Sequence, residues 1–181
     1  MKPELALLDR LDAEHSELTR DTQNLENIAN DLDAITGLKK ASGDFVPWQA
    51  VRCKQILQEL RQLLEMIDRK LSAHFKREEK ELLELCQTHT DDVAFGSVLL
   101  NFIIEHEEIT SRIAKSKLDI ATLANEKISP YIWESRAYPV RFYINHTCRR
   151  LQAHAESEQE LLNALRRKLE DDQAKRTGTN V

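Results

Sequence analysis

Apolar residues recur at intervals of three and four along most of this chain, in four long blocks. This interval matches one face of an α-helix, so each block predicts a helix that packs one face against other helices. Polar segments at residues 36–47, 88–92 and 125–130 are the predicted connections. Four successive helices with mostly short connections indicate an all-α fold, an up-down-up-down antiparallel four-helix bundle.

The bundle is predicted to take up residues 1–170, and residues 171–181 form a polar C-terminal tail that we expect to be disordered. Only 4 Gly and 4 Pro occur in 181 residues, which argues against a β-sandwich or barrel with its many tight turns. Pro139 falls inside the last block or just at its start, and predicts either a kink or a helix start there.

Titratable residues interrupt each apolar stripe at one place. Four histidines, one in each predicted helix, stand where a leucine would be expected, and a glutamate follows two of them four residues later. The six residues are His15, His74, Glu78, His106, His154 and Glu158. Their distances along the chain from the connections differ by a few helical turns at most, so we expect all six to lie near one level of the bundle and to point inward.

A single core histidine is more often a hydrogen-bonded structural residue than a metal ligand. A buried carboxylate without a partner costs several kcal/mol, however, so two glutamates on core stripes require a compensating charge. Four imidazoles and two carboxylates exceed what one zinc ion needs, whereas carboxylates and histidines inside helical bundles hold two-metal iron or manganese sites.

We therefore predict a centre of two metal ions, each held by two histidines, with Glu78 and Glu158 bridging both. Iron is the expected metal, and manganese or zinc is the alternative. The remaining coordination positions would take a shared oxo or hydroxo bridge and an exogenous small molecule.

The ordered set of ligands across four helices resembles the hemerythrin-like HHE cation-binding domains over about residues 5–170. It consists of His15, His74-x-x-x-Glu78, His106 and His154-x-x-x-Glu158. The adjacent pairs Glu14-His15 and Glu105-His106 are similar to that family as well. The resemblance implies a four-helix bundle with a di-iron centre.

The chain also departs from the oxygen-carrying hemerythrins. Those proteins have a fifth histidine one turn after the third-helix ligand, where this chain has Thr110, and their last carboxylate stands where this chain has Gln159. The spacing of Glu158 is more similar to the di-iron repair proteins of nitrosative stress and to the iron-sensing hemerythrin domain of an F-box protein. These departures weaken the case for reversible oxygen carriage and leave sensing, redox or nitric-oxide chemistry open.

The leading hypothesis is a non-enzymatic di-iron protein that binds or senses a small diatomic ligand such as O2 or NO, or responds to iron or redox state. One alternative is a di-iron redox enzyme that reduces nitric oxide or peroxide in stress defence. Another is a bundle that serves as an interaction module around a structural metal.

Charge and composition exclude other functions. A formal net charge of -5 disfavours a nucleic-acid partner, and the longest apolar run, at residues 98–104, is too short to span a membrane. The N-terminus has no signal-peptide pattern. Cys53, Cys86 and Cys148 are odd in number and widely spaced, which favours the reducing cytoplasm over a disulfide framework.

The third predicted helix carries more apolar surface than one stripe requires. Val93, Leu100 and Ile104 lie on a second, shorter stripe. We expect it either to be covered by a loop at residues 131–138 or to pair with a second subunit, and we favour a homodimer.

Overall fold

The computed structural model describes residues 3–42, 47–89, 93–124 and 130–178, with side chains described at 3–32, 51–88, 95–124 and 135–175. These residues are all-helical, and no strand occurs among them. The elements are α1 (Pro3–Ser42), α2 (Pro47–Arg77), a π-helical turn (Glu78–Leu82), α3 (Leu83–His89), α4 (Val93–Leu123) and α5 (Pro130–Gly178). Among the described residues, no helix combines the length and hydrophobicity needed to cross a bilayer.

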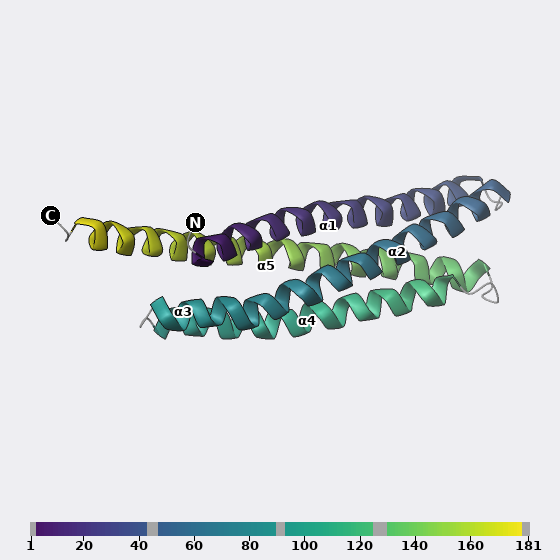
Figure 1. The fold of residues 1–181 in the computed structure, drawn as a ribbon. Coiled ribbons are helices and arrows are strands. Elements are labelled where there is room, and N and C mark those ends of the chain that lie inside the picture. The colour runs from purple at the N-terminus through teal and green to yellow at the C-terminus, as the bar shows by residue number, and fades with distance from the viewer. Residues whose placement is uncertain (1–2, 43–46, 90–92, 125–129, 179–181) are drawn as a thin grey trace.

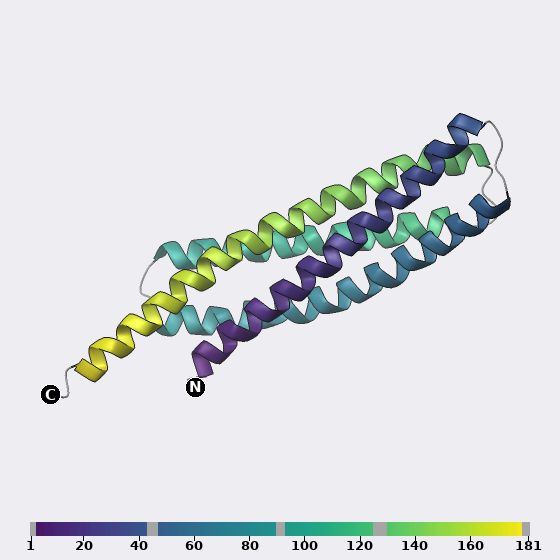
Figure 2. The same cartoon turned by 90° about the horizontal axis from the view of Figure 1, so that it is seen from above.

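The long helices form a bundle in which each contacts two others. α1 packs against α2 and α5, and α4 also packs against α2 and α5. Figures 1 and 2 show the start of α1, α3 and the end of α5 at one end of the bundle, and the starts of α2 and α5 at the other. The side chains that face inward from these four helices therefore share the interior of one bundle.

Three of the helices begin at a proline, namely α1, α2 and α5. Proline suits the first helical position because its fixed φ is helical and its missing N–H would be unpaired there in any case. Since α5 begins at Pro130, Pro139 lies inside a helix, and the prediction of a helix start at that residue is wrong. The residues expected to form a loop at 131–138 likewise belong to α5.

Two helices are longer than the sequence pattern predicted. α1 continues to Ser42 instead of ending before residue 36, because the helix-favouring residues after Gly37 offset the cost of about 1 kcal/mol of one glycine. α5 continues to Gly178, so the prediction of a disordered tail is wrong for residues 171–178. The helix-forming residues Gln173, Ala174 and Lys175 favour this extension, and residues 179–181 lie outside the described part.

The predicted apolar stripes are confirmed as the core. Read at intervals of three and four, the stripes run from Leu8 to Leu32, from Cys53 to Leu85, from Phe95 to Leu123 and from Val140 to Leu169. Every member is buried apart from Phe95, which is half-buried. The apolar core falls into two separate clusters, one around Leu18, Leu71 and Ile109 and the other around Leu11 and Leu82. The layer between these two clusters holds the six histidines and glutamates.

Candidate metal centre

All six residues singled out in the sequence come together in that layer, and each is at most 5% exposed. α1 contributes His15, α2 contributes His74, α4 contributes His106, and α5 contributes His154 and Glu158. The sixth residue, at position 78, begins the π-helical turn.

The π-helical turn keeps one stripe of α2 facing the core. Buried residues follow at positions 74, 78, 82 and 86, four apart, whereas an α-helix turns once in about 3.6 residues. A stripe with that spacing would rotate away from the core in a regular α-helix. In the wider π-helical turn the N–H of Leu83 donates to the carbonyl of Glu78, five residues earlier. The additional residue in this turn compensates for the difference between a spacing of four and 3.6 residues per turn, so the stripe keeps facing the core.

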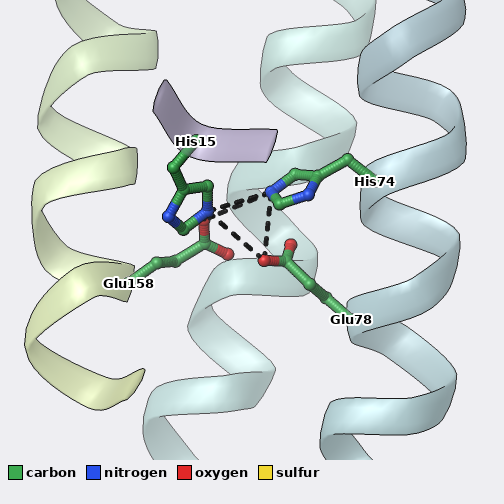
Figure 3. Close-up of side chains that lie close together, drawn as sticks. All are labelled: His15, His74, Glu78 and Glu158. Atoms are coloured by element: carbon green, nitrogen blue, oxygen red, sulfur yellow. Dashed lines mark hydrogen bonds and ion pairs between the residues drawn. The ribbon is translucent and has the colours of Figure 1, made fainter. Parts of the chain in front are cut away.

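His15 and His74 form one half of the cluster (Figure 3). Their Nε2 atoms lie 3.0 Å apart, which is about the separation of two nitrogens bound at a right angle to one metal ion with bonds of about 2.1 Å. Oε1 of Glu78 lies 3.1 Å from His74 Nε2 and 3.6 Å from His15 Nε2. Oε2 of Glu158 lies 3.1 Å from His15 Nε2 and 3.9 Å from His74 Nε2.

His106 and His154 form the other half with the remaining oxygens of the same two glutamates. Oε2 of Glu78 lies 3.4 Å from His106 Nε2. Oε1 of Glu158 lies 3.5 Å from His106 Nε2 and 3.3 Å from His154 Nε2. Each carboxylate thus turns one oxygen to each pair of histidines, and within each half four donor atoms lie within 4.8 Å of one another.

The hydrogen bonding of these atoms fits a pair of cations. Six of the inward-facing atoms of the cluster have no hydrogen-bond partner among the described residues, namely both oxygens of Glu78, both oxygens of Glu158, and Nε2 of His106 and of His154. Buried polar atoms are nearly always satisfied in folded proteins, because an unpaired one costs about 1–3 kcal/mol. One metal ion bound within each half would satisfy all six.

A ring of glutamates outside the centre orients three of the histidines. Each receives a hydrogen bond from the Nδ1–H of a histidine on the next helix of the bundle, which fixes the tautomer that leaves Nε2 free to face inward. The pairs are His74 with Glu14 at 2.9 Å, His106 with Glu79 at 3.0 Å and His154 with Glu105 at 2.7 Å.

Sequence reasoning did not assign this role to the three glutamates. The available signal was their position, because each is adjacent in sequence to one of the six inner residues. Neighbouring positions on a helix point about 100° apart, so a residue beside an inward-facing one is directed toward the adjacent helix. His15 is the exception, since its buried Nδ1 has no partner among the described residues.

Aromatic rings fix the planes of two histidines. Phe75 stacks on His106, with ring centroids 3.8 Å apart and an angle of 8° between the planes. Phe102 meets His154 edge to face at 5.4 Å. These contacts and the outer glutamates leave the rings on α4 and α5 little freedom to turn away.

The charges of the six residues are strongly coupled. Burial by itself lowers the pKa of the histidines, but the carboxylates of Glu158 and Glu78 outweigh it and raise the pKa to about 9 for His15, about 10 for His74 and about 9 for His106. Burial raises the pKa of the carboxyls, but the imidazoles hold the pKa of Glu78 below its usual value and that of Glu158 well below it. Metal binding must therefore displace protons from imidazolium groups.

The two halves differ in the space beside them. A cavity of about 80 Å³ adjoins His15 and His74 and also reaches His154, and its other lining residues include Thr22, Gln152 and Cys148. The cavity beside His106 measures only about 10 Å³. Since one water needs roughly 10–15 Å³, the first cavity takes a few water-sized molecules, and sites for organic ligands are usually several times larger.

Comparison with known protein families gives one match. The model of the family described as Hemerythrin, the hemerythrin HHE cation binding domain, matches residues 6–165. All six residues of the cluster and the three outer glutamates lie within the matched range. No curated protein and no solved structure matches the chain.

Proposed function

This chain belongs to the hemerythrin HHE cation-binding domain family, and on that premise we propose that it holds two iron ions at the centre of its bundle. His15 and His74 would bind one ion, His106 and His154 would bind the other, and both glutamates would bridge them. The observation that carries this proposal is that each carboxylate presents one oxygen to each pair of histidines. Such carboxylates neutralise two cations and fix the distance between them.

We propose that the exogenous ligand is a small molecule such as O2 or NO, and that it reaches the centre on the side of His15 and His74. The cavity of about 80 Å³ on that side supports this assignment, because it has room for a diatomic molecule and too little for an ordinary organic substrate. The packed side around His106 has no comparable space. When bound, the iron pair would supply the redox-active site that binds the small molecule.

Binding or sensing fits this site better than turnover. Cys148 is the thiol that lines the cavity, and burial raises its pKa to about 12. A thiol that stays protonated is a poor nucleophile and a poor reductant, so the cavity offers no reactive cysteine to sustain a redox cycle. The cysteines at positions 53, 86 and 148 are free and buried, which supports a cytoplasmic setting.

We also propose the up-down-up-down antiparallel topology for residues 1–170. It is supported by the order of contacts, in which α1 meets α2, α2 meets α4, α4 meets α5 and α5 meets α1. This topology places one ligand-bearing segment of every long helix at the same level.

Metal analysis of natively purified protein tests the proposal. We expect two iron ions per chain and an oxo-to-iron absorption band in the near ultraviolet. His74→Ala should lose the ion on its own side and keep the other, whereas Glu158→Gln should weaken both sites, because Glu158 serves both halves. His146→Ala is the matched control, since His146 is an exposed histidine that contacts Arg112 on the surface. Full occupancy in His74→Ala and Glu158→Gln would refute the assignment.

A further inference from the structure

The outward face of α4 is unusually apolar. Where side chains are described, exposed large apolar residues gather mainly on α4 and α5; they are Val98, Leu100, Ile104, Leu118, Tyr138 and Phe142. Three of them, Leu100, Ile104 and Leu118, are 63–67% exposed and lie on the side of α4 opposite the core. The helical segment 135–138 of α5 leaves Leu100 and Ile104 uncovered.

These residues belong to a second helical stripe. Its members follow at intervals of three and four and are Leu100, Ile104, Glu107, Ser111, Lys115, Leu118 and Thr122. The stripe thus has apolar side chains near both ends, the charged residues Glu107 and Lys115 nearer its middle, and the small side chain of Ser111 at its centre. Intervals of this kind are the pattern of a helix that packs against another helix.

A groove lies beside the C-terminal half of the stripe. It has a volume of about 570 Å³ and runs between α4 and α5. Its lining is mainly apolar, with Leu118, Pro139, Val140 and Phe142, and also includes the charged residues Lys115, Asp119 and Arg136. The stripe therefore presents projecting aliphatic side chains in its first half and an apolar groove beside its second half.

We propose that this face of α4 pairs with the same face of a second copy of the chain, antiparallel and about a twofold axis at Ser111. Ile104 and Leu118 lie seven residues before and after Ser111, so the twofold sets Ile104 against the partner's Leu118. Leu100 and Thr122 lie eleven residues before and after it and face each other in the same way. The aliphatic side chains of each copy then enter the groove of the other, as a self-complementary interface requires.

Charge favours the same register. Glu107 and Lys115 lie four residues before and after Ser111, so the antiparallel pairing sets each glutamate against the partner's lysine. No other described residue forms an ion pair with Glu107, whereas Lys115 reaches Asp119 on its own helix. A parallel pairing would instead set Glu107 against Glu107, so the charges select the antiparallel arrangement.

The concentration dependence of assembly provides the first test. Sedimentation of the wild type between about 1 and about 100 µM should show a monomer–dimer equilibrium, because an interface made chiefly by one helix face is at the small end of stable interfaces. Ile104→Glu should weaken the dimer by at least about tenfold, since it replaces the aliphatic side chain that packs against the partner's Leu118 with a charged one. Val51→Glu is the matched control, because Val51 is also an exposed apolar residue but lies on α2.

Two further experiments test the register. Ser111→Cys should form an intermolecular disulfide under mild oxidation, because this position meets its own copy at the axis, whereas Thr110→Cys on another side of α4 should not. The native cysteines are buried and would not interfere. Glu107→Lys should weaken the dimer several-fold, and adding Lys115→Glu should restore it. A wild type that is monomeric at about 100 µM, or equal crosslinking of the two cysteine variants, would overturn the proposal.

Discussion

Removing one outer glutamate should weaken metal binding without disturbing the fold. Glu105 accepts a hydrogen bond of 2.7 Å from Nδ1 of His154 and thereby holds the ring with Nε2 facing the centre. Replacing such a partner lowers metal affinity by about 10–100-fold in comparable sites. The Glu105 side chain is 34% exposed, so water can partly replace it, and we expect Glu105→Gln to lose about tenfold, or about 1.4 kcal/mol.

The measurement is an anaerobic titration with ferrous ion against a chelator of known affinity. Glu160→Gln is the matched control, since Glu160 is an exposed glutamate on α5 that contacts no histidine among the described residues. Glu14→Gln should have a larger effect than Glu105→Gln, because Glu14 is only 22% exposed and also binds Arg77 at 2.6 Å. Unchanged affinity in Glu105→Gln, or an equal loss in Glu160→Gln, would refute this account of the outer glutamates. Destabilisation of the metal-free protein by the same amount would show that Glu105 acts on the fold instead.

Four further outcomes are expected. With both sites at about a hundredfold excess over their dissociation constants, metal should stabilise the fold by ~5 kcal/mol and raise the melting temperature by about 10–20 °C; equal melting temperatures for apo and loaded protein would contradict a core site. Between pH 7 and pH 10 the metal-free protein should lose stability, because the raised pKa values of His15, His74 and His106 stabilise it fully only below pH 6.5 and this stabilisation is lost as pH rises through about 9–10. Metal binding should release protons over the same range, which an indicator dye would detect, and an absence of release would show that the imidazoles are already neutral. A limiting amount of chelator should remove the ion on the side of His15 first, because Nδ1 of His15 lacks a partner among the described residues. For the same reason His15→Ala should keep one tightly bound ion. Simultaneous loss of both ions would contradict a difference in affinity between the two sites.

Periodicity in the sequence was sufficient to predict the bundle and its core. The intervals of three and four identified the buried face of each helix, because every helical turn places an apolar residue on the face that packs against the core. Charged groups on such a face require compensation, so the types and the common level of the six central residues also followed from the sequence. The same pattern located the exposed second stripe at Leu100 and Ile104, while the side chain of its third predicted member, Val93, lies outside the described part of the chain.

Local sequence was a poorer guide to where helices end. Gly37 and the polar residues after 170 suggested breaks, yet α1 and α5 continue through both, and α5 passes through Pro139. The cost of one glycine or proline is a few kcal/mol at most, and the remaining helix-forming residues and packing along a long helix offset it. The π-helical turn at Glu78 was not predicted either, although the repeated four-residue interval from His74 to Cys86 was a signal for it.

Only the tertiary structure decided which atoms meet. Periodicity specifies the face of a helix on which a residue lies, but the partner across the bundle depends on how the helices pack and which rotamers they allow. For this reason the division of the oxygens of Glu78 and Glu158 between two histidine pairs, and the hydrogen bond from His154 to Glu105, emerged only from the packed helices. The unequal cavities beside the two halves have the same origin, since an empty volume is what remains after neighbouring side chains have packed.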